Sequence, residues 1–379
     1  MAEKDIIPGS SPPARLISSL QEGVTKHSDT FIANKWLKQL EEEFCTDLVK
    51  DTNSTLRWLD YIDKECSVDV KKGLKPFTFD FEALYDSLTP ELVKEAIKFA
   101  IAKCRPNWSI DFSNWVVSNI DLSMKSAICF HKGKWYKPVD GIPTGGSLSV
   151  QLANIAVFYV LHLTLYSNES LMCHIHSIKR FIDDETGFFS GTMIQFESWK
   201  NELTSALNKY KLNVKNEDWN IATESGSTVH FLDIKFGFDK DSHLKTDIYI
   251  KETDSRSFLD FNSCHPNHTF SSIVYSQAIR YRRIINDDNL LKTRLNELKF
   301  FFRLSNYPRK MINNIIDKVV NLPRVLDTHK PITPSGEKVV SVISTHGRDD
   351  ILCNITKPVS ILLTENKVVT KFKYIKKNV

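Results

Sequence analysis

Residues 178–189 read Ile-Lys-Arg-Phe-Ile-Asp-Asp-Glu-Thr-Gly-Phe-Phe. Two short runs of apolar residues flank the acidic pair Asp183-Asp184, a pattern typical of two strands joined by a tight turn. Adjacent carboxylates repel each other unless a cation binds, and hard oxygen ligands on rigid strands suit Mg²⁺. The stretch alone fits either a metal-binding hairpin or an ordinary solvated turn.

A second acidic strand is expected at residues 76–85, which read Pro-Phe-Thr-Phe-Asp-Phe-Glu-Ala-Leu-Tyr and place Asp80 at the end of an aromatic run. If this strand lies beside the one that carries Asp183, the two carboxylates could bind two Mg²⁺ ions about 3.5–4 Å apart, which is the arrangement used for in-line phosphoryl transfer. The spacing alone does not establish that the strands are neighbours.

A glycine-rich loop is the third feature. Residues 141–146 read Gly-Ile-Pro-Thr-Gly-Gly and lead into an apolar helix. Glycine lets the backbone approach a ligand closely, and a helix N-terminus accommodates phosphate groups. The loop matches neither the P-loop nor the dinucleotide-binding pattern, so by itself it fits a structural loop as well as a binding loop.

The remaining pattern mixes helices and strands without strict alternation, which favours an α+β fold over a doubly wound parallel sheet. Thr89 and Pro90 predict a helix start, and residues 152–165 predict a buried helix because they are apolar nearly all round. Residues 229–238 have apolar side chains at period two and predict one strand, with residues 244–250 as its partner across a turn.

Composition bounds the class of protein. The chain has 379 residues, 41% hydrophobic and 25% charged, and its 13 Gly and 14 Pro exclude collagen-like and disordered classes. The apolar stretch at residues 152–166 is shorter than a membrane span of about 20 residues, so no membrane partner is expected. Residues 1–13 lack the apolar core of a secretory signal. Seven scattered cysteines without a CxxC pair predict reduced thiols in an intracellular protein.

Charge is unevenly distributed. Residues 271–310 hold nine Lys and Arg against three Asp and Glu, a local charge of +6, whereas the whole chain carries a formal net charge of +4. A basic segment on a nearly neutral body fits either a surface for a polyanion or a solvated helix face.

Taken together, the ordered segments resemble reverse transcriptases. Residues 79–85, 141–149 and 181–184 are similar, in this order, to the three palm motifs of that family. The later segments are similar to the palm-to-thumb region of Penelope-like retroelement reverse transcriptases, a branch related to telomerase; they are residues 246–254, 262–266 and 276–283. The resemblance covers roughly residues 14–318.

The resemblance implies a right-hand polymerase of the α+β class, with an antiparallel-sheet palm and a helical thumb. Because the similarity begins near Ala14, only part of the fingers is expected. The implied domains are partial fingers at 1–76, a palm at 77–255 with a helical insertion at about 89–135, a thumb at 256–322 and a C-terminal extension at 323–379.

The family's metal-binding roles transfer to matching positions. Asp80 and Asp183 would bridge two Mg²⁺ ions, or Mn²⁺, with the Phe81 carbonyl as a backbone ligand, and Asp184 would assist beside them. Tyr85 occupies the position of the steric gate that excludes a ribose 2′-OH.

The same transfer assigns contacts to nucleotide and template–primer. The nucleotide-binding residues would be Arg15, Tyr85, Thr144, Gly145, Gly146 and a lysine that protonates pyrophosphate, either Lys211 or Lys215. The template–primer residues would be Leu232 and Asp233 in a primer grip and Arg280, Arg282 and Arg283 on the basic thumb helix.

The implied activity is RNA-directed DNA synthesis from dNTPs on an RNA template and a DNA primer, at a nuclear location. Two alternatives stay open. One is a catalytically inactive, nucleic-acid-binding remnant of a retroelement, and the other is an RNA-templated RNA polymerase, which a bulky Tyr85 disfavours. Thr144 and Phe181 depart from residues common in the family without removing a metal ligand.

Overall fold

The computed structural model describes residues 25–131, 133–137 and 140–326. These residues form two compact units. The first contains residues 25–256 together with 281–294, and the second contains 257–280 together with 295–326. Arg15 and the expected extension beyond residue 326 lie outside the described residues, whereas the other candidate site residues lie within them.

A four-stranded antiparallel sheet forms the centre of the first unit, in the order β4-β5-β1-β6. A second antiparallel sheet has the order β7-β8-β9, and β2 and β3 form a separate pair. The strands are β1 (Leu74–Asp80), β2 (Cys129–His131), β3 (Lys134–Tyr136), β4 (Ile175–Phe181), β5 (Asp184–Ser190), β6 (Asn220–Ile221), β7 (Val229–Phe231), β8 (Ile234–Phe238) and β9 (Leu244–Ile248).

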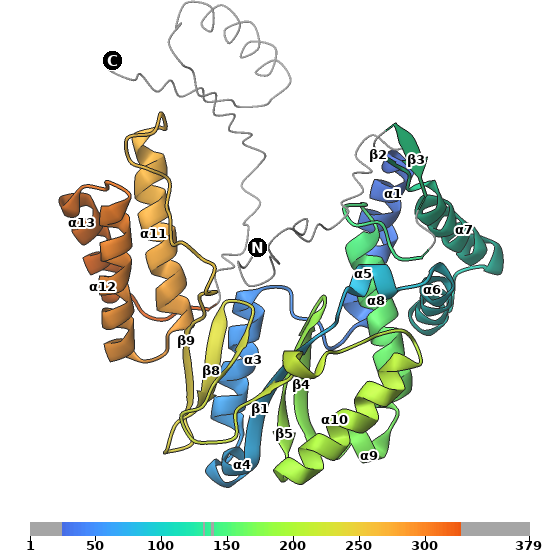
Figure 1. Ribbon diagram of the computed structural model, residues 1–379, viewed down its shortest axis with the longest axis horizontal. Helices are drawn as coiled ribbons and strands as arrows, with labels where there is room; N and C mark the ends of the chain where they lie inside the picture. Colours follow the sequence, from blue (N-terminus) through green and yellow to red (C-terminus); the bar gives the residue numbers. More distant parts are fainter. Residues whose placement is uncertain (1–24, 132, 138–139, 327–379) are drawn as a thin grey trace, which may run out of the picture. The chain divides into compact units, whose positions relative to one another are not determined.

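Helices account for most of the rest of the first unit (Figure 1). In the first unit they are α1 (Lys26–Ile32), η2 (Ala33–Leu37), α2 (Lys38–Phe44), α3 (Thr52–Glu65), α4 (Val68–Gly73), α5 (Leu84–Ser87), α6 (Pro90–Cys104), α7 (Ile110–Ser126), α8 (Ser149–Leu161), η3 (His162–Tyr166), α9 (Glu169–Met172), α10 (Met193–Asn208) and η4 (Asn216–Asp218). The mixture of helices with antiparallel sheets confirms the α+β class.

Alternating residues of β5 pack against different partners, so the central sheet is covered on both faces. Phe189 contacts Trp199 of α10 with ring centroids 5.7 Å apart. The preceding residue, Phe188, instead contacts Trp58 of α3 at 5.3 Å and Phe236 of β8 at 6.0 Å. Since neighbouring strand residues point to opposite faces, α10 covers one face and α3 with the β7-β8-β9 sheet covers the other.

The predicted helices are confirmed. Thr89 caps α6, and its side chain accepts a hydrogen bond from the Leu92 amide at 3.3 Å. Among the described residues, 149–166 form the one helix long and apolar enough to cross a membrane. That segment is 67% buried within the protein, so burial in the core accounts for its apolar composition.

One strand prediction is wrong. Residues 229–238 form a hairpin of two strands, β7 and β8, rather than a single strand. Leu232 lies in the turn with a left-handed φ of 56°. An alternating pattern does not reveal such a reversal when the turn contains no glycine, and for that reason the sequence indicated one strand. The expected pairing with residues 244–250 is confirmed by β9.

The second unit is helical. It contains most of α11 (Asn267–Ile284), the C-terminal part of α12 (Asp288–Leu304) and α13 (Arg309–Val320). Its core is aromatic. Phe302 stacks on Phe258 with centroids 4.2 Å apart and contacts Tyr307 at 5.1 Å. Residues 281–294 belong to the first unit, although they follow the boundary that the sequence placed at 255/256.

Candidate active site

Three acidic residues from two distant segments, Asp80 and the pair Asp183-Asp184, meet at one end of the central sheet. Strand β1 pairs antiparallel with β5 so that Asp80 lies opposite Asp184. One residue further along, the Phe81 amide donates a hydrogen bond to the Asp183 carbonyl at 3.0 Å. The pairing that the sequence could not establish is therefore present, and it places Asp80 beside the Asp183-Asp184 turn.

The backbone is strained in the turns around this position. Ala83, Ile182 and Leu232 adopt left-handed φ angles of 46°, 58° and 56°. Such angles are disfavoured for residues with a Cβ, and most of all for a β-branched residue such as Ile182. Ala83 follows the Asp80 strand, Ile182 precedes Asp183, and Leu232 contacts Asp184. Strained residues of this kind cluster at functional sites.

The Asp184 carboxylate is held between the two sheets. Its Oδ2 accepts a hydrogen bond from the Leu232 amide at 3.4 Å. Burial raises the pKa of Asp184 to about 7, the Leu232 hydrogen bond opposes this shift, and the charges of Asp80 and Asp183 add to it. The negative charges of Asp80 and Asp183 thus disfavour ionisation of Asp184, and a bound cation would offset this repulsion.

The donor chemistry fits a hard divalent cation. Asp80 is exposed and Asp183 is half-buried at the same sheet end, and carboxylate and carbonyl oxygens are the ligands that Mg²⁺ prefers. Within the described residues, no group of three or more His, Cys, Asp or Glu side chains is arranged to hold a metal ion. Asp80, Asp183 and Asp184 are therefore not arranged as one such group, and their expected role as metal ligands together with the Phe81 carbonyl stays a prediction.

The glycine-rich loop packs against the backbone of Tyr85. The Ile142 amide donates to the Tyr85 carbonyl at 2.7 Å. Gly141 has φ +90°, and a Cβ there would lie 2.9 Å from the same carbonyl oxygen. The close approach of the loop to the Tyr85 carbonyl therefore requires glycine at position 141. Gly145 is exposed with φ 96°, and Thr144 and Gly146 beside it are half-buried.

Tyr85 lies between this loop and the acidic cluster. Its side chain is half-buried. Burial, with a smaller effect from the Asp183 charge, raises the pKa of Tyr85. That dependence on Asp183 puts the phenol within electrostatic reach of the carboxylates.

Of the two candidate lysines, Lys215 lies nearer the Asp80 segment. Its Nζ lies 3.0 Å from Glu82 Oε1, and this hydrogen bond raises the pKa of Lys215. The Glu82 amide in turn donates to the Asn213 carbonyl at 2.8 Å, which ties the lysine's loop to the end of β1. Lys211 instead pairs with Asp140 at 3.7 Å.

The expected template–primer residues fall into separate environments. Asp233, in the β7–β8 turn, accepts a hydrogen bond from Thr52 Oγ1 at 2.6 Å. Arg282 Nη1 donates to Asp288 Oδ1 at 2.7 Å, which leaves its side chain 13% exposed. Arg280 and Arg283 are half-buried on α11 and belong to different units.

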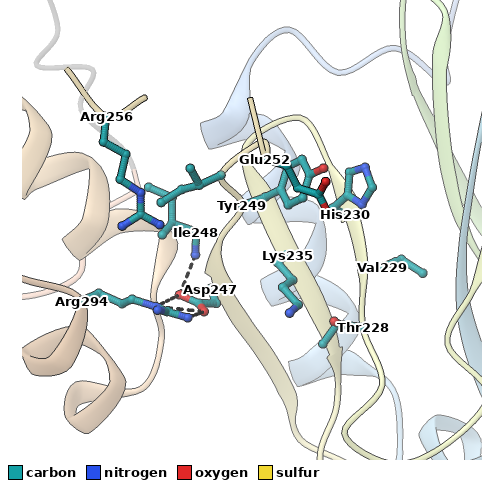
Figure 2. A pocket seen from close by; sticks show the side chains of 11 residues that line it. Thr228, Val229, His230, Lys235, Asp247, Ile248, Tyr249, Glu252, Arg256 and Arg294 are labelled. Atoms are coloured by element: carbon teal, nitrogen blue, oxygen red, sulfur yellow. Dashed lines mark hydrogen bonds and ion pairs between the residues drawn. The ribbon is translucent and has the colours of Figure 1, made fainter. Parts of the chain in front are cut away.

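A cavity of about 450 Å³ lies on the outer face of the β7-β8-β9 sheet, and sequence reasoning missed it (Figure 2). The His230 ring stacks on Tyr249 at 3.9 Å, and Arg294 Nη2 pairs with Asp247 Oδ2 at 2.7 Å. Burial, with nearby lysines, lowers the pKa of His230. The alternation along β7 and β9 indicates that these residues share a face, but no sequence signal predicts the Arg294 contact.

Comparison with known proteins finds solved structures of similar fold and one family model that matches a short part of the chain. A family model described as an animal helix-turn-helix domain matches residues 257–317. No curated protein matches the chain. The structure of telomerase from Candida albicans, in complex with a TWJ fragment of telomeric RNA, has a TM-score of 0.52 at 13% identity and covers 79% of this chain and 48% of that one.

Two structures of telomerase from Candida tropicalis are also similar. The apo form has a TM-score of 0.49 at 14% identity, and it covers 79% of this chain and 50% of that one. The apo form truncated from the C-terminal domain has a TM-score of 0.46 at 17% identity, with coverages of 60% and 46%. This chain thus spans about half the length of these telomerase chains. The Candida albicans match shows that the fold of this chain is similar to that of telomerase.

Proposed function

We propose that the chain is an RNA-directed DNA polymerase that adds dNTPs to the 3′-OH of a primer annealed to an RNA template. The observation that carries this proposal is the register of β1 and β5, which sets Asp80 opposite Asp184. The same register lets the Phe81 amide donate a hydrogen bond to the Asp183 carbonyl. The telomerase-like fold supports the proposal, as does the similarity of residues 79–85, 141–149 and 181–184 to the palm motifs of reverse transcriptases.

In this function Asp80, Asp183 and the Phe81 carbonyl would hold two Mg²⁺ ions. When bound, such ions lower the cost of forming the primer alkoxide and neutralise charge on the triphosphate. The chain's own residues supply position. The turn between β4 and β5 would position the Asp183 carboxylate, and the end of β1 would position that of Asp80. The Tyr85 ring would lie beside the sugar of the nucleotide. Lys215, which pairs with Glu82, would give a proton to the departing pyrophosphate.

A primer-extension assay tests this proposal. The purified chain, a homopolymer RNA template, a complementary DNA primer and titrated Mg²⁺ are incubated with dNTPs or, in parallel, with NTPs. We expect extension with dNTPs that requires Mg²⁺ or Mn²⁺. Extension with NTPs alone would support an RNA polymerase instead.

Salt-sensitive binding of template–primer without extension would identify the inactive remnant. The observation that favours this second candidate is the short helix-turn-helix match at residues 257–317, because it concerns the basic helical segment and not the carboxylates. Both candidates predict binding that weakens with salt, so extension is the result that separates them.

The Tyr85→Ala substitution is expected to relax sugar selection. Removing the ring opens space where a ribose 2′-OH would otherwise clash, and shape-based exclusion of this kind is worth about 10- to 100-fold in discrimination. We therefore expect the ratio of dNTP to NTP incorporation, measured as kcat/KM for each, to fall by that factor. Tyr85→Phe is the control, since it keeps the ring and should keep the ratio. An unchanged ratio in Tyr85→Ala would exclude the steric-gate role.

A further inference from the structure

Arg180 is completely buried, at 0% exposure, on strand β4. Its guanidinium reaches three separate segments. Nε and Nη2 donate to the two carboxylate oxygens of Asp47 at 3.1 and 3.4 Å. Nη1 donates to Asn154 Oδ1 on α8 at 3.1 Å, and Nη2 donates to the Asn154 carbonyl at 3.0 Å. A further hydrogen bond runs from Nη1 to the Ile182 carbonyl at 3.1 Å.

The Ile182 contact lies at the strained turn before Asp183. Ile182 is β-branched and left-handed, with φ 58°, so this backbone conformation persists only if its surroundings hold it. Two hydrogen bonds do so from opposite sides. Arg180 binds the Ile182 carbonyl, and the Phe81 amide binds the Asp183 carbonyl at 3.0 Å. The peptide units on both sides of the Asp183 Cα are therefore fixed, and with them the direction of its Cα–Cβ bond.

Arg180 also balances buried acids. Glu185 is fully buried, its Oε1 lies 3.4 Å from Arg180 Nε, and neither of its carboxylate oxygens has a hydrogen-bond partner among the described residues. A lysine could balance the charge of Asp47, which pairs with Arg180, because one ammonium suffices for that purpose. It could not reproduce the planar fork that reaches Asp47, Asn154 and Ile182 together. The two roles, charge balance and turn clamping, can thus be separated by substitution.

We propose that Arg180 is a positioning residue for Asp183, which clamps the left-handed turn at Ile182 so that the Asp183 carboxylate stays beside Asp80. The kinetic consequence rests on the proposed polymerase function, whereas the clamp itself is a property of the fold. Nothing in the linear sequence marks Arg180, because its partners Asp47 and Asn154 come from distant segments.

Arg180→Lys tests the clamp while keeping the positive charge. The matched control is Lys71→Met, which removes another buried cation of the first unit. Lys71 is 5% exposed and its Nζ lies 3.1 Å from Asp63 Oδ1. Both variants should lower the midpoint of thermal unfolding. We expect Arg180→Lys alone to lower kcat, by about 10- to 100-fold with little change in the KM for dNTP, because misplacing a reacting group by about 1 Å has effects of this size.

Hydrogen exchange provides a readout that does not depend on activity. The Phe81 amide reports on the turn, since it donates to the Asp183 carbonyl. We expect this amide to exchange faster in Arg180→Lys and at the wild-type rate in Lys71→Met. If Arg180→Lys does not fold, the triple variant Arg180→Met, Asp47→Asn and Glu185→Gln replaces it, because it leaves no unpaired buried charge.

Each outcome decides the proposal. A lower kcat together with faster hydrogen exchange of the Phe81 amide in the Arg180 variant, but not in Lys71→Met, supports the clamp. Equal kcat and equal protection in the two variants overturns it. If the wild-type chain extends no primer, the polymerase function fails, and hydrogen exchange alone then decides: faster exchange at Phe81 supports the clamp, and unchanged exchange refutes it.

Discussion

Asp183→Asn is expected to abolish Mg²⁺-dependent primer extension, with kcat lower by about a thousandfold or more, as for removal of other groups that stabilise transition-state charge. The substitution keeps the size of the side chain but replaces a charged oxygen ligand by a neutral amide. The Phe81–Asp183 hydrogen bond involves only backbone atoms, so the turn should persist. The measurement is single-turnover extension at saturating dNTP and template–primer.

Two controls separate lost chemistry from lost binding. Asp69→Asn makes the same chemical change at a side chain that is 95% exposed, and it should leave kcat unaltered. Template–primer affinity, measured by fluorescence anisotropy at fixed salt, should be equal in wild type and Asp183→Asn. Extension by purified Asp183→Asn at a rate near that of wild type would refute the metal-ligand assignment.

Gly187→Ala is expected to destabilise the first unit by about 3 kcal/mol, at the upper end of the usual range for overpacking a core. Gly187 lies in the centre of β5, between Phe77 of β1 and Ile178 of β4. A Cβ there would lie 2.7 Å from Phe77 Cζ and 2.7 Å from the Ser177 carbonyl oxygen. The backbone oxygen cannot move without breaking the sheet, so β5 must shift.

The control for Gly187→Ala is Gly73→Ala. A Cβ at Gly73, the last residue of α4, would meet no atom within 4 Å, and alanine favours helices. The free energy of unfolding, measured by urea denaturation and followed by circular dichroism, should fall strongly in Gly187→Ala and should not fall in Gly73→Ala. Equal stability of the two variants would mean that β5 is not packed as described.

Local patterns predicted the elements that carry the acidic residues. The two apolar runs around Asp183-Asp184 and the aromatic run ending at Asp80 each indicated a strand, and all three strands are present as β4, β5 and β1. What local pattern could not supply was their pairing, because register depends on contacts between distant segments. The resemblance to reverse transcriptases implied this convergence where spacing could not.

The features that sequence reasoning missed depend on tertiary contacts. The reversal at Leu232 was interpreted as continuous strand because nothing marks a left-handed turn that lacks glycine. In the sequence Arg180 does not differ from the other basic residues. In the fold it is buried and donates hydrogen bonds to Asp47 and Asn154, which come from two distant segments. Strain at Ile182 follows from the paired strands on either side, which force the chain to reverse within two residues.

The most direct test of the acidic site is a crystal structure of the protein with Mn²⁺, located by its anomalous scattering. We expect anomalous density coordinated by the Asp80 and Asp183 carboxylates and the Phe81 carbonyl, and its loss in Asp183→Asn. Mn²⁺ bound only elsewhere, or carboxylates of Asp80 and Asp183 that point to separate regions of the protein, would contradict the assignment of this sheet end as the catalytic site.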